Sequence, residues 1–271
     1  MCHHCVVESV KDRMLDRRSL FTGAAMAAVA VAAGSLPAAA QVSATGKAMD
    51  MTHELHPDFP TYFGAQQFWL EPKFTYAKEK FNLNEWRLNE HTGTHMDAPL
   101  HFSADGKSVA EIPVESLVVP VSVIDIREKA AASADAEVTP DDIKAWVAAN
   151  GPLPKGGCVA MNSGWDAHLG TDKFRNADGE KKMHFPGFHL EAAKMLIEDA
   201  NTIGIAVDTL SLDFGMSGDF AAHYAWLPTG RWGIENLANL NSLPAKGATL
   251  IVGAPKVKGG TGGPCRVFAI A

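Results

Sequence analysis

The sequence predicts an α/β or α+β domain. In its second half, short apolar runs rich in β-branched residues alternate with segments of helical periodicity, while the first half is mostly extended. Residues 41–271 contain no internal repeat and no long low-complexity tract, and they are numerous enough for a substantial core. We therefore expect one domain there.

The first forty residues have the composition of a targeting segment. Arg17 and Arg18 precede an uncharged, alanine-rich stretch, and the residues up to Ala40 are the small ones that a signal peptidase recognises. The paired arginines resemble a twin-arginine export signal, although Asp16 stands where Ser or Thr is preferred. A membrane anchor is the alternative, but the stretch is weaker and shorter than the ~20 apolar residues of a spanning helix. We expect residues 1–40 to be the signal, residues 41–271 the mature domain, and the location periplasmic.

Charge and cysteine content narrow the classes of partner. The chain has a formal net charge of −7 and no basic runs, which argues against nucleic acid or an anionic membrane as partner. Only Cys158 and Cys265 remain after residue 40. We expect two buried small apolar side chains, with a disulfide in an oxidising compartment as the alternative.

The elements follow one another from residue 82. Residues 82–90 and 116–126 are typical of strands, and an alanine-rich loop is expected over 127–140. Thr139 then caps a helix that starts with Pro140 and ends before Gly151. Further along, a helix is expected within residues 189–201 and strands within residues 156–165, 202–213, 247–257 and 265–271. The glycine-rich stretches "GMSGDF" and "GGTGGP" lack the context of a phosphate-binding loop and are interpreted as flexible loops.

The segment "HTGTHMDAPLHF", residues 91–102, collects side chains that bind metals or move protons. Gly93 allows a tight bend that brings His91 and His95 around one centre. His95 and Asp97 project to the same side of an extended chain. Pro99 fixes the following loop, which carries His101 back toward them. This pattern predicts a metal or catalytic site.

The same segment resembles the signature H-x-G-T-H-x-D-x-P-x-H-F of the metal-dependent cyclase-like hydrolases, the family of bacterial kynurenine formamidases and isatin hydrolases. Its fixed positions are occupied by His91, Gly93, Thr94, His95, Asp97, Pro99, His101 and Phe102. The resemblance extends along most of residues 49–271, through "DMTHELHPDFP", "PGFHLEAAKMLIE", "IAVDTLSLD" and "ENLANLNSLP", the last resembling a late helix. It departs at residues 170–185, which the shorter formamidases lack in this form and which could reshape the substrate mouth. The resemblance implies a swivelling β/β/α fold, commonly dimeric or tetrameric.

The resemblance also implies a set of ligands. His91, His95 and Asp97 would bind a first divalent ion, and His223 with Glu235 would bind a second, toward which Asp97 could bridge. Imidazole and carboxylate ligands without thiolate favour Zn, Mn or Fe over copper(I) or an iron–sulfur centre, and the expected cofactor is Zn or Mn, as one or two ions. Ions of this kind polarise a carbonyl and activate water.

Further residues are candidates for proton transfer and substrate binding. His101 is the expected proton donor and acceptor, because an ordinary histidine pKa lies near the working pH; a role as a further ligand is the alternative. The expected substrate-binding residues are His53, Phe63, Trp69, Asn162 and Trp165. A plain loop position is the alternative for His53, and a core or dimer contact is the alternative for Phe63 and Trp69. Phe63 and Trp69 belong to an aromatic-rich loop and could stack on a substrate ring.

These observations together predict an exported hydrolase that cleaves a C–N bond by metal-activated water. The expected substrate is a small aromatic amide, either an aryl formamide or an isatin-like cyclic amide. A lactone hydrolase or a cyclase of the same fold is an alternative within the enzymes. A periplasmic metal-binding or ligand-binding module is the alternative outside them, although metal binding alone would not need His101 as a free base.

Overall fold

The structure is a computed structural model that describes residues 46–199 and 202–271. The predicted signal at residues 1–40 lies outside these residues. The described chain separates into two compact units, a hairpin segment Leu70–Trp86 and a body that holds the rest. None of the helices in the described ranges is long and apolar enough to cross a membrane.

The hairpin is formed by β2 (Phe68–Phe74) and β3 (Leu83–Leu88), with the short helix α2 (Tyr76–Glu79) between them. Inside this segment the rings of Phe74 and Phe81 lie 5.1 Å apart. Lys73 Nζ lies 2.8 Å from the Glu71 carboxylate. The predicted strand within residues 82–90 is confirmed by β3.

The body is built on one nine-stranded sheet, in the order β1-β13-β11-β5-β7-β9-β10-β4-β12. Its strands are β1 (Ala48–Asp50), β4 (His95–Asp97), β5 (Val118–Asp125), β7 (Gly157–Asn162), β9 (Thr202–Val207), β10 (Trp232–Glu235), β11 (Ala248–Gly253), β12 (Gly262–Pro264) and β13 (Arg266–Ile270). The pairs β5–β7, β7–β9 and β9–β10 are parallel, and the other pairs of this sheet are antiparallel. A small parallel pair is formed by β6 (Glu137–Val138) and β8 (Gly187–Phe188).

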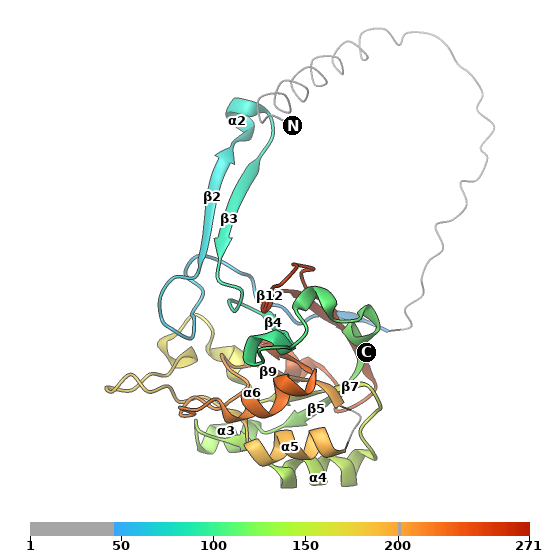
Figure 1. Cartoon of the computed structure of the whole chain (residues 1–271). Helices are drawn as coiled ribbons and strands as arrows, with labels where there is room; N and C mark the ends of the chain where they lie inside the picture. Colours follow the sequence, from blue (N-terminus) through green and yellow to red (C-terminus); the bar gives the residue numbers. More distant parts are fainter. Residues whose placement is uncertain (1–45, 200–201) are drawn as a thin grey trace, which may run out of the picture. The chain divides into compact units, whose positions relative to one another are not determined.

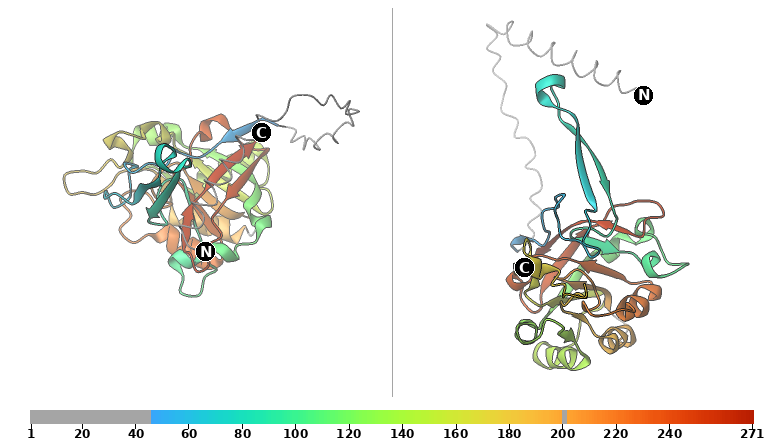
Figure 2. Two further views of the ribbon diagram at one scale, coloured as in Figure 1. Left: turned by 90° about the horizontal axis from the view of Figure 1, so that it is seen from above. Right: turned by 90° about the vertical axis from the view of Figure 1, so that its left-hand side faces the viewer.

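The longer helices of the body are α3 (Arg127–Ala132), α4 (Pro140–Asn150), α5 (Leu190–Glu198) and α6 (Ala221–Trp226). Figures 1 and 2 show α4 and α5 side by side on one face of the strands. Helix α4 begins as predicted, because Thr139 and Asp142 form a capping box. Single 3₁₀ turns include η1 (Pro99–Phe102), which directly follows β4, and η7 (Leu240–Ser242).

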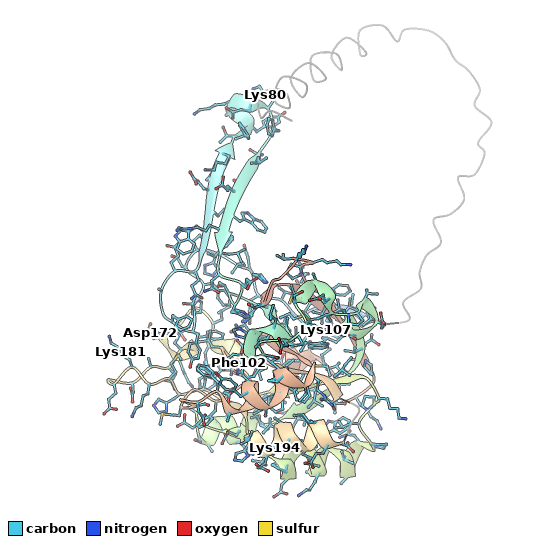
Figure 3. All side chains as sticks on the ribbon, in the orientation of Figure 1. Lys80, Phe102, Lys107, Asp172, Lys181 and Lys194 are labelled. Atoms are coloured by element: carbon cyan, nitrogen blue, oxygen red, sulfur yellow. The ribbon has the colours of Figure 1, made fainter. Side chains whose placement is uncertain are left out.

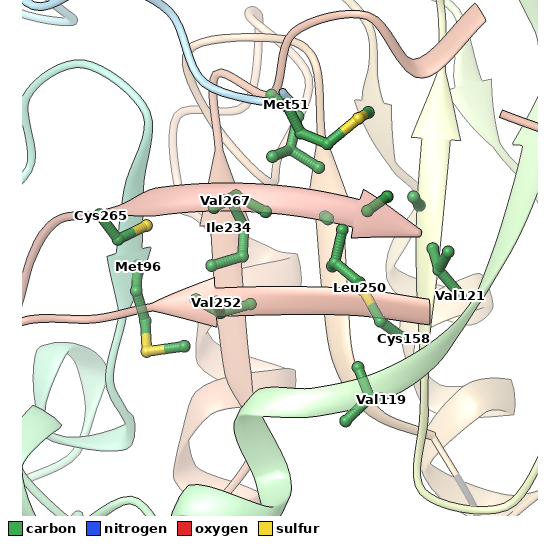
Figure 4. Close-up of a cluster of buried hydrophobic side chains, with 14 of the residues drawn as sticks. Met51, Met96, Val119, Val121, Cys158, Ile234, Leu250, Val252, Cys265 and Val267 are labelled. Atoms are coloured by element: carbon green, nitrogen blue, oxygen red, sulfur yellow. The ribbon is translucent and has the colours of Figure 1, made fainter. Parts of the chain in front are cut away.

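Two large apolar clusters lie on opposite faces of the curled sheet. The first joins strands from its two ends, so that Met96 of β4 and Val267 of β13 belong to one core (Figure 4). The second fills the space between the sheet and the helices and contains Leu196 of α5 and Trp226 of α6. Cys158 and Cys265 are buried and do not form a disulfide. This confirms the prediction that they are small buried apolar side chains. The mixed α/β fold predicted from the sequence is confirmed.

Three local predictions are wrong for identifiable reasons. Residues 127–132 form α3 instead of a loop, in keeping with the high helix propensity of their alanines. The expected late helix is absent from "ENLANLNSLP", where Glu235 ends β10 and only the short turn η7 follows. The second half of "GGTGGP", Gly262–Pro264, is the edge strand β12, although glycine has low strand propensity.

Candidate metal centre

The turn before β4 and the strand itself orient His95 and Asp97. Gly93 has a φ of +70°, and a Cβ atom there would lie 2.9 Å from Leu55 Cδ1, so the position favours glycine. Because successive strand side chains alternate, His95 and Asp97 project to one face while Met96 projects into the core. This part of the sequence-based geometry is confirmed.

Strand β10 adds a second carboxylate to this face. In the antiparallel register, Glu235 lies opposite His95, while on the other side of β4 Gly262 lies opposite Asp97. His95 donates its Nδ1–H to the Gly93 carbonyl oxygen over 2.8 Å. This bond leaves His95 Nε2 directed at the two carboxylates, 3.4 Å from Asp97 Oδ1 and 3.3 Å from Glu235 Oε2.

Helix α6 brings His223 to the same point. His223 Nε2 lies 3.1 Å from Glu235 Oε1 and 3.5 Å from Asp97 Oδ2. Its other ring nitrogen, Nδ1, lies 2.6 Å from Asp213 Oδ2. Asp213 also accepts the backbone N–H of Ala222 at the start of α6, so one carboxylate fixes both the helix end and the imidazole.

His91 and His101 complete the cluster from the side of η1. His91 Nδ1 lies 2.7 Å from Asp97 Oδ1. The His101 ring stacks on that of His91, with centroids 3.7 Å apart, and its centroid lies 6.0 Å from that of His223. Phe102, labelled in Figure 3, packs beside His101 and against the His223 ring.

Two groups of side chains could each hold a metal ion, and they share Asp97. Within each group, one ligand atom per residue lies within 4.8 Å of the others; the groups are His91, Asp97 and His101, and His95, Asp97 and Glu235. The sequence had paired His91 with His95. The structure turns His95 toward Glu235 instead, because the Gly93 carbonyl holds the opposite ring nitrogen. All five predicted ligands nevertheless converge.

The electrostatics of this cluster favour a positive charge next to its buried carboxylates. Burial raises the Asp97 pKa, but the surrounding imidazoles, first that of His223, outweigh it and hold the pKa well below its usual range. Burial lowers the His95 pKa, but the carboxylates of Asp97 and Glu235 outweigh it and raise the pKa to about 10. His101 differs, because burial lowers its pKa to about 4. It is therefore neutral near pH 7, at a pKa lower than the ordinary value expected from the sequence.

The residues present fit a divalent ion. His95 Nε2 and Asp97 Oδ2 are buried without a hydrogen-bond partner among the described residues, although both lie near opposite charges. Unsatisfied buried polar atoms are costly, and a cation placed among them would satisfy them. The donor atoms are imidazole nitrogens and carboxylate oxygens, which suit Zn and Mn.

A pocket opens above this cluster, with about 520 Å³ of empty space that includes open solvent. Its polar floor includes His91, His95, His223 and Glu235, and its apolar wall includes Pro60, Tyr62, Phe63, Leu210 and Phe220. The Tyr62 ring packs against those of Phe63 and Phe220, with centroids 5.4 and 5.7 Å away. A flat aromatic molecule would meet ring faces on one side and the ionisable cluster on the other.

Only one of the five predicted substrate-binding residues, Phe63, lines this pocket. Trp69 stands on β2, not in a loop, and its ring faces the Arg87 guanidinium at 3.8 Å. His53 lies against the rings of Phe59 and Phe174, outside the pocket lining.

Asn162 and Trp165 serve the local backbone. The Asn162 side chain accepts the Gly164 N–H. Trp165 is buried and donates its indole N–H to the Phe174 carbonyl oxygen. The buried Asp208 carboxylate accepts the backbone N–H of Ser163 and of Trp165.

Three residues of the site were missed by sequence reasoning, namely Asp213, Tyr62 and Phe220. Asp213 stood at the end of a predicted strand, and nothing local marks it as the partner of a histidine ten residues later. Tyr62 could have been predicted, because it belongs to the same aromatic-rich stretch as Phe63. Phe220 has a φ of +51°, unusual for a bulky residue, and this is visible only in the structure.

Residues 170–185 contact the loop that carries Tyr62 of the apolar pocket wall. Phe174 is fully buried, and its ring lies 6.4 Å from that of Phe59. Arg175 donates from Nη2 to the Tyr62 carbonyl oxygen over 3.0 Å, and its guanidinium lies directly under Gly64. The more exposed part of the segment carries Asp172 and Lys181, labelled in Figure 3. These contacts support the expectation that this segment shapes the substrate mouth.

Comparison with known proteins adds an independent line of argument. The Cyclase family matches residues 49–214. An isatin hydrolase from Roseibium aggregatum is 38% identical over 200 residues, covering 70% of this chain and 75% of that protein. A kynurenine formamidase from Salinibacter ruber is 29% identical over 188 residues, covering 68% and 78%. The structure of an isatin hydrolase bound to the product analogue thioisatinate superposes with a TM-score of 0.77 at 33% identity, over 83% of this chain and 92% of that one.

The family match covers the turn and strand that carry His91, His95 and Asp97, and it spans more than half of the chain. With its curled sheet, its convergent imidazoles and carboxylates, and its relatives among the isatin hydrolases and kynurenine formamidases, the chain belongs to the cyclase family.

Proposed function

We propose that this protein is a metal-dependent hydrolase that cleaves a non-peptide C–N bond, in an aryl formamide or in a cyclic amide fused to an aromatic ring. One observation carries the proposal: an aromatic-walled pocket opens directly over a buried cluster of imidazoles and carboxylates centred on Asp97. The isatin-like cyclic amide is the preferred substrate type, since an isatin hydrolase is the relative at 38% identity.

The proposed ligands are His91, His95, Asp97, His223 and Glu235, with Asp97 shared between two sites and His95 on the same side as Glu235. The shared position of Asp97 in both candidate groups supports this assignment, and so do the buried, unpartnered Nε2 of His95 and Oδ2 of Asp97. We propose Zn or Mn as the ion, at one or two per chain.

A bound divalent ion would supply Lewis acidity toward the amide carbonyl and would lower the pKa of water toward neutrality. The chain's own residues supply the rest. His101 is neutral near pH 7 and would take the proton that the attacking water loses. With a pKa of about 4 it is a weak base but, once protonated, a strong acid that returns this proton to the leaving nitrogen. Tyr62, Phe63 and Phe220 would orient the aromatic ring, and Asp213 keeps His223 in place.

The test is a hydrolysis screen with purified protein residues 41–271, stripped by chelator and reloaded with Zn or Mn. Isatin, N-formylkynurenine, formanilide and an aromatic lactone form the panel. We expect hydrolysis of isatin or of a formamide that depends on added metal. Hydrolysis of the lactone alone would replace the C–N assignment by a C–O one, and metal binding without turnover of any of them would favour a binding module.

Two further proposals concern the setting of the enzyme. Export through the twin-arginine pathway is supported by Arg17 and Arg18 ahead of the alanine-rich stretch. A fusion of residues 1–45 to a folded reporter should reach the periplasm, and a reporter that stays in the cytoplasm would refute export.

We also propose a homodimer or homotetramer, which sedimentation analysis of the purified protein would test.

A further inference from the structure

The "GGTGGP" stretch lies against the metal centre. Strand β12 is the edge strand beside β4, the strand that carries His95 and Asp97. The backbone on both sides of Thr261 is fixed, because Ala98 donates to the Thr261 carbonyl and Val109 donates to the Gly260 carbonyl. The side chain of Thr261 is therefore held at a defined place.

Thr261 is hydrogen-bonded to two residues that are adjacent in sequence, Glu90 and His91. Its hydroxyl donates to Glu90 Oε2 over 2.5 Å, and its backbone N–H points at the same carboxylate, 3.2 Å from Oε2. His91 Nε2 lies 2.9 Å from the Thr261 hydroxyl oxygen. A carboxylate only accepts hydrogen bonds, so the single hydroxyl proton is committed to Glu90. The hydroxyl oxygen can then only accept from His91, whose Nε2 must carry a proton.

This chain of hydrogen bonds decides which nitrogen of His91 is free. With the proton on Nε2, the lone pair of the neutral ring is on Nδ1, which lies 2.7 Å from Asp97 Oδ1. A lone pair and a carboxylate at this distance repel each other unless a cation or a proton lies between them. The ring is thereby prepared as a ligand through Nδ1, and metal-binding histidines commonly donate their other N–H in this way.

The glycines explain why the loop can come so close. A Cβ atom at Gly262 would lie 2.2 Å from the Met96 carbonyl oxygen and 2.7 Å from His91 Cε1. A Cβ atom at Gly260 would lie 3.0 Å from Glu90 Oε1. Any side chain at position 262 would therefore push β12 away from β4 and separate Thr261 from His91.

We propose that Glu90 and Thr261 are positioning residues of the metal centre, which orient His91 and fix its proton on Nε2 so that Nδ1 binds the ion. This proposal rests on the proposed metal site. It assigns a role to the glycine-rich loop that neither the sequence pattern nor the proposed reaction requires.

The test measures Zn²⁺ affinity in Thr261→Val, Thr261→Ser and wild type by competition with a chromophoric chelator. Valine keeps the shape of threonine and removes the hydroxyl, so we expect the dissociation constant to rise about 10- to 100-fold. Serine should restore most of the affinity. Thr249→Val, on β11 away from β4, is the matched control and should bind Zn²⁺ as wild type does.

A second measurement reads the hydrogen bond itself. In the Zn²⁺-loaded wild type and in Thr261→Ser, the Nε2–H of His91 should give a proton NMR signal protected from exchange with water, and Thr261→Val should lose that protection. Unchanged affinity and protection in Thr261→Val would overturn the proposal. If that variant does not fold, Glu90→Gln decides, since an amide oxygen is a weaker acceptor; we expect a several-fold weaker affinity, and wild-type affinity would refute it. A wild type that binds neither Zn²⁺ nor Mn²⁺ would refute the metal centre as a whole.

Discussion

The imidazole rings of His91 and His101 are stacked, with centroids 3.7 Å apart and an angle of 19° between their planes. Burial lowers the pKa of His101 to about 4, so at neutral pH it is an uncharged ring beside the cluster. The stack holds His101 beside the cluster, where one of its ring nitrogens lies within 4.8 Å of a ring nitrogen of His91 and a carboxylate oxygen of Asp97. Proton transfer and metal binding are thus the two roles that geometry allows His101.

Replacement of His101 by Asn distinguishes these roles. If His101 transfers protons, kcat should fall about 10²- to 10⁴-fold while the metal content stays at the wild-type value. Steady-state hydrolysis and elemental analysis of the same preparation measure both. His189→Asn is the matched control, because His189 caps α5 and asparagine is a favoured cap. Loss of metal from the His101 variant would identify His101 as a ligand instead.

Replacement of Asp97 by Asn should empty the whole centre. Asp97 belongs to both candidate groups, whereas Glu235 belongs to one. We therefore expect Asp97→Asn to retain almost no metal and Glu235→Gln to retain a distinctly larger share, as measured by elemental analysis after dialysis. Asp125→Asn removes an exposed carboxylate that pairs with Arg127 and should change nothing. Equal metal retention in the Asp97 and Glu235 variants would contradict the shared role of Asp97.

The sequence could predict the part of the site that is formed by residues close together along the chain. The bend at Gly93 and the common side of His95 and Asp97 follow from local backbone geometry. The approach of Glu235 depends on the pairing of β10 with β4, which joins segments far apart in sequence. Only the resemblance to a family, and no spacing rule, pointed to it.

The residues that orient the cluster escaped prediction for a related reason. Asp213 and Thr261 act through single hydrogen bonds to His223 and His91, and neither lies in a pattern that marks such a contact. Composition was misleading for β12, since glycine is usual in loops. There the absence of a side chain at Gly262 permits a close approach of two strands.

Arg175 should control how well aromatic substrates bind. Its guanidinium donates to the Tyr62 carbonyl oxygen and supports Gly64, so Arg175→Ala would free the loop that carries Tyr62 and Phe63. The loss of one charge-assisted hydrogen bond is worth about 1.5 to 3 kcal/mol, part of which would be lost from substrate binding. We expect KM for an aromatic amide to rise about 5- to 20-fold with little change in kcat.

The control for Arg175 is Lys182→Ala, in the same segment. Lys182 pairs with Glu180 and does not line the pocket, so its loss should leave KM unchanged. A fall in kcat at constant KM in Arg175→Ala would mean that the segment acts on the chemistry and not on the aromatic wall.

Asp208 should make stability depend on pH between about pH 4 and pH 7. Its carboxyl is fully buried, and burial raises its pKa from 3.8 to about 7. The folded state therefore holds the proton more tightly than the unfolded state. The stabilisation is complete below about pH 4 and is lost as pH rises through 7, with a total change on the order of 4 kcal/mol.

Asp208→Asn removes this titration without removing its hydrogen bonds. Asp208 Oδ2 accepts the backbone N–H groups of Ser163 and Trp165, and an amide oxygen can do the same. Asp208 Oδ1 faces the Ser163 hydroxyl, which can rotate to accept from an amide NH₂. Urea unfolding of both proteins at several pH values should show the wild type losing stability relative to the variant as pH rises from 4 to 8. A constant difference between the two proteins across this range would mean that Asp208 is ionised throughout, and that its three hydrogen bonds fully offset the cost of its burial.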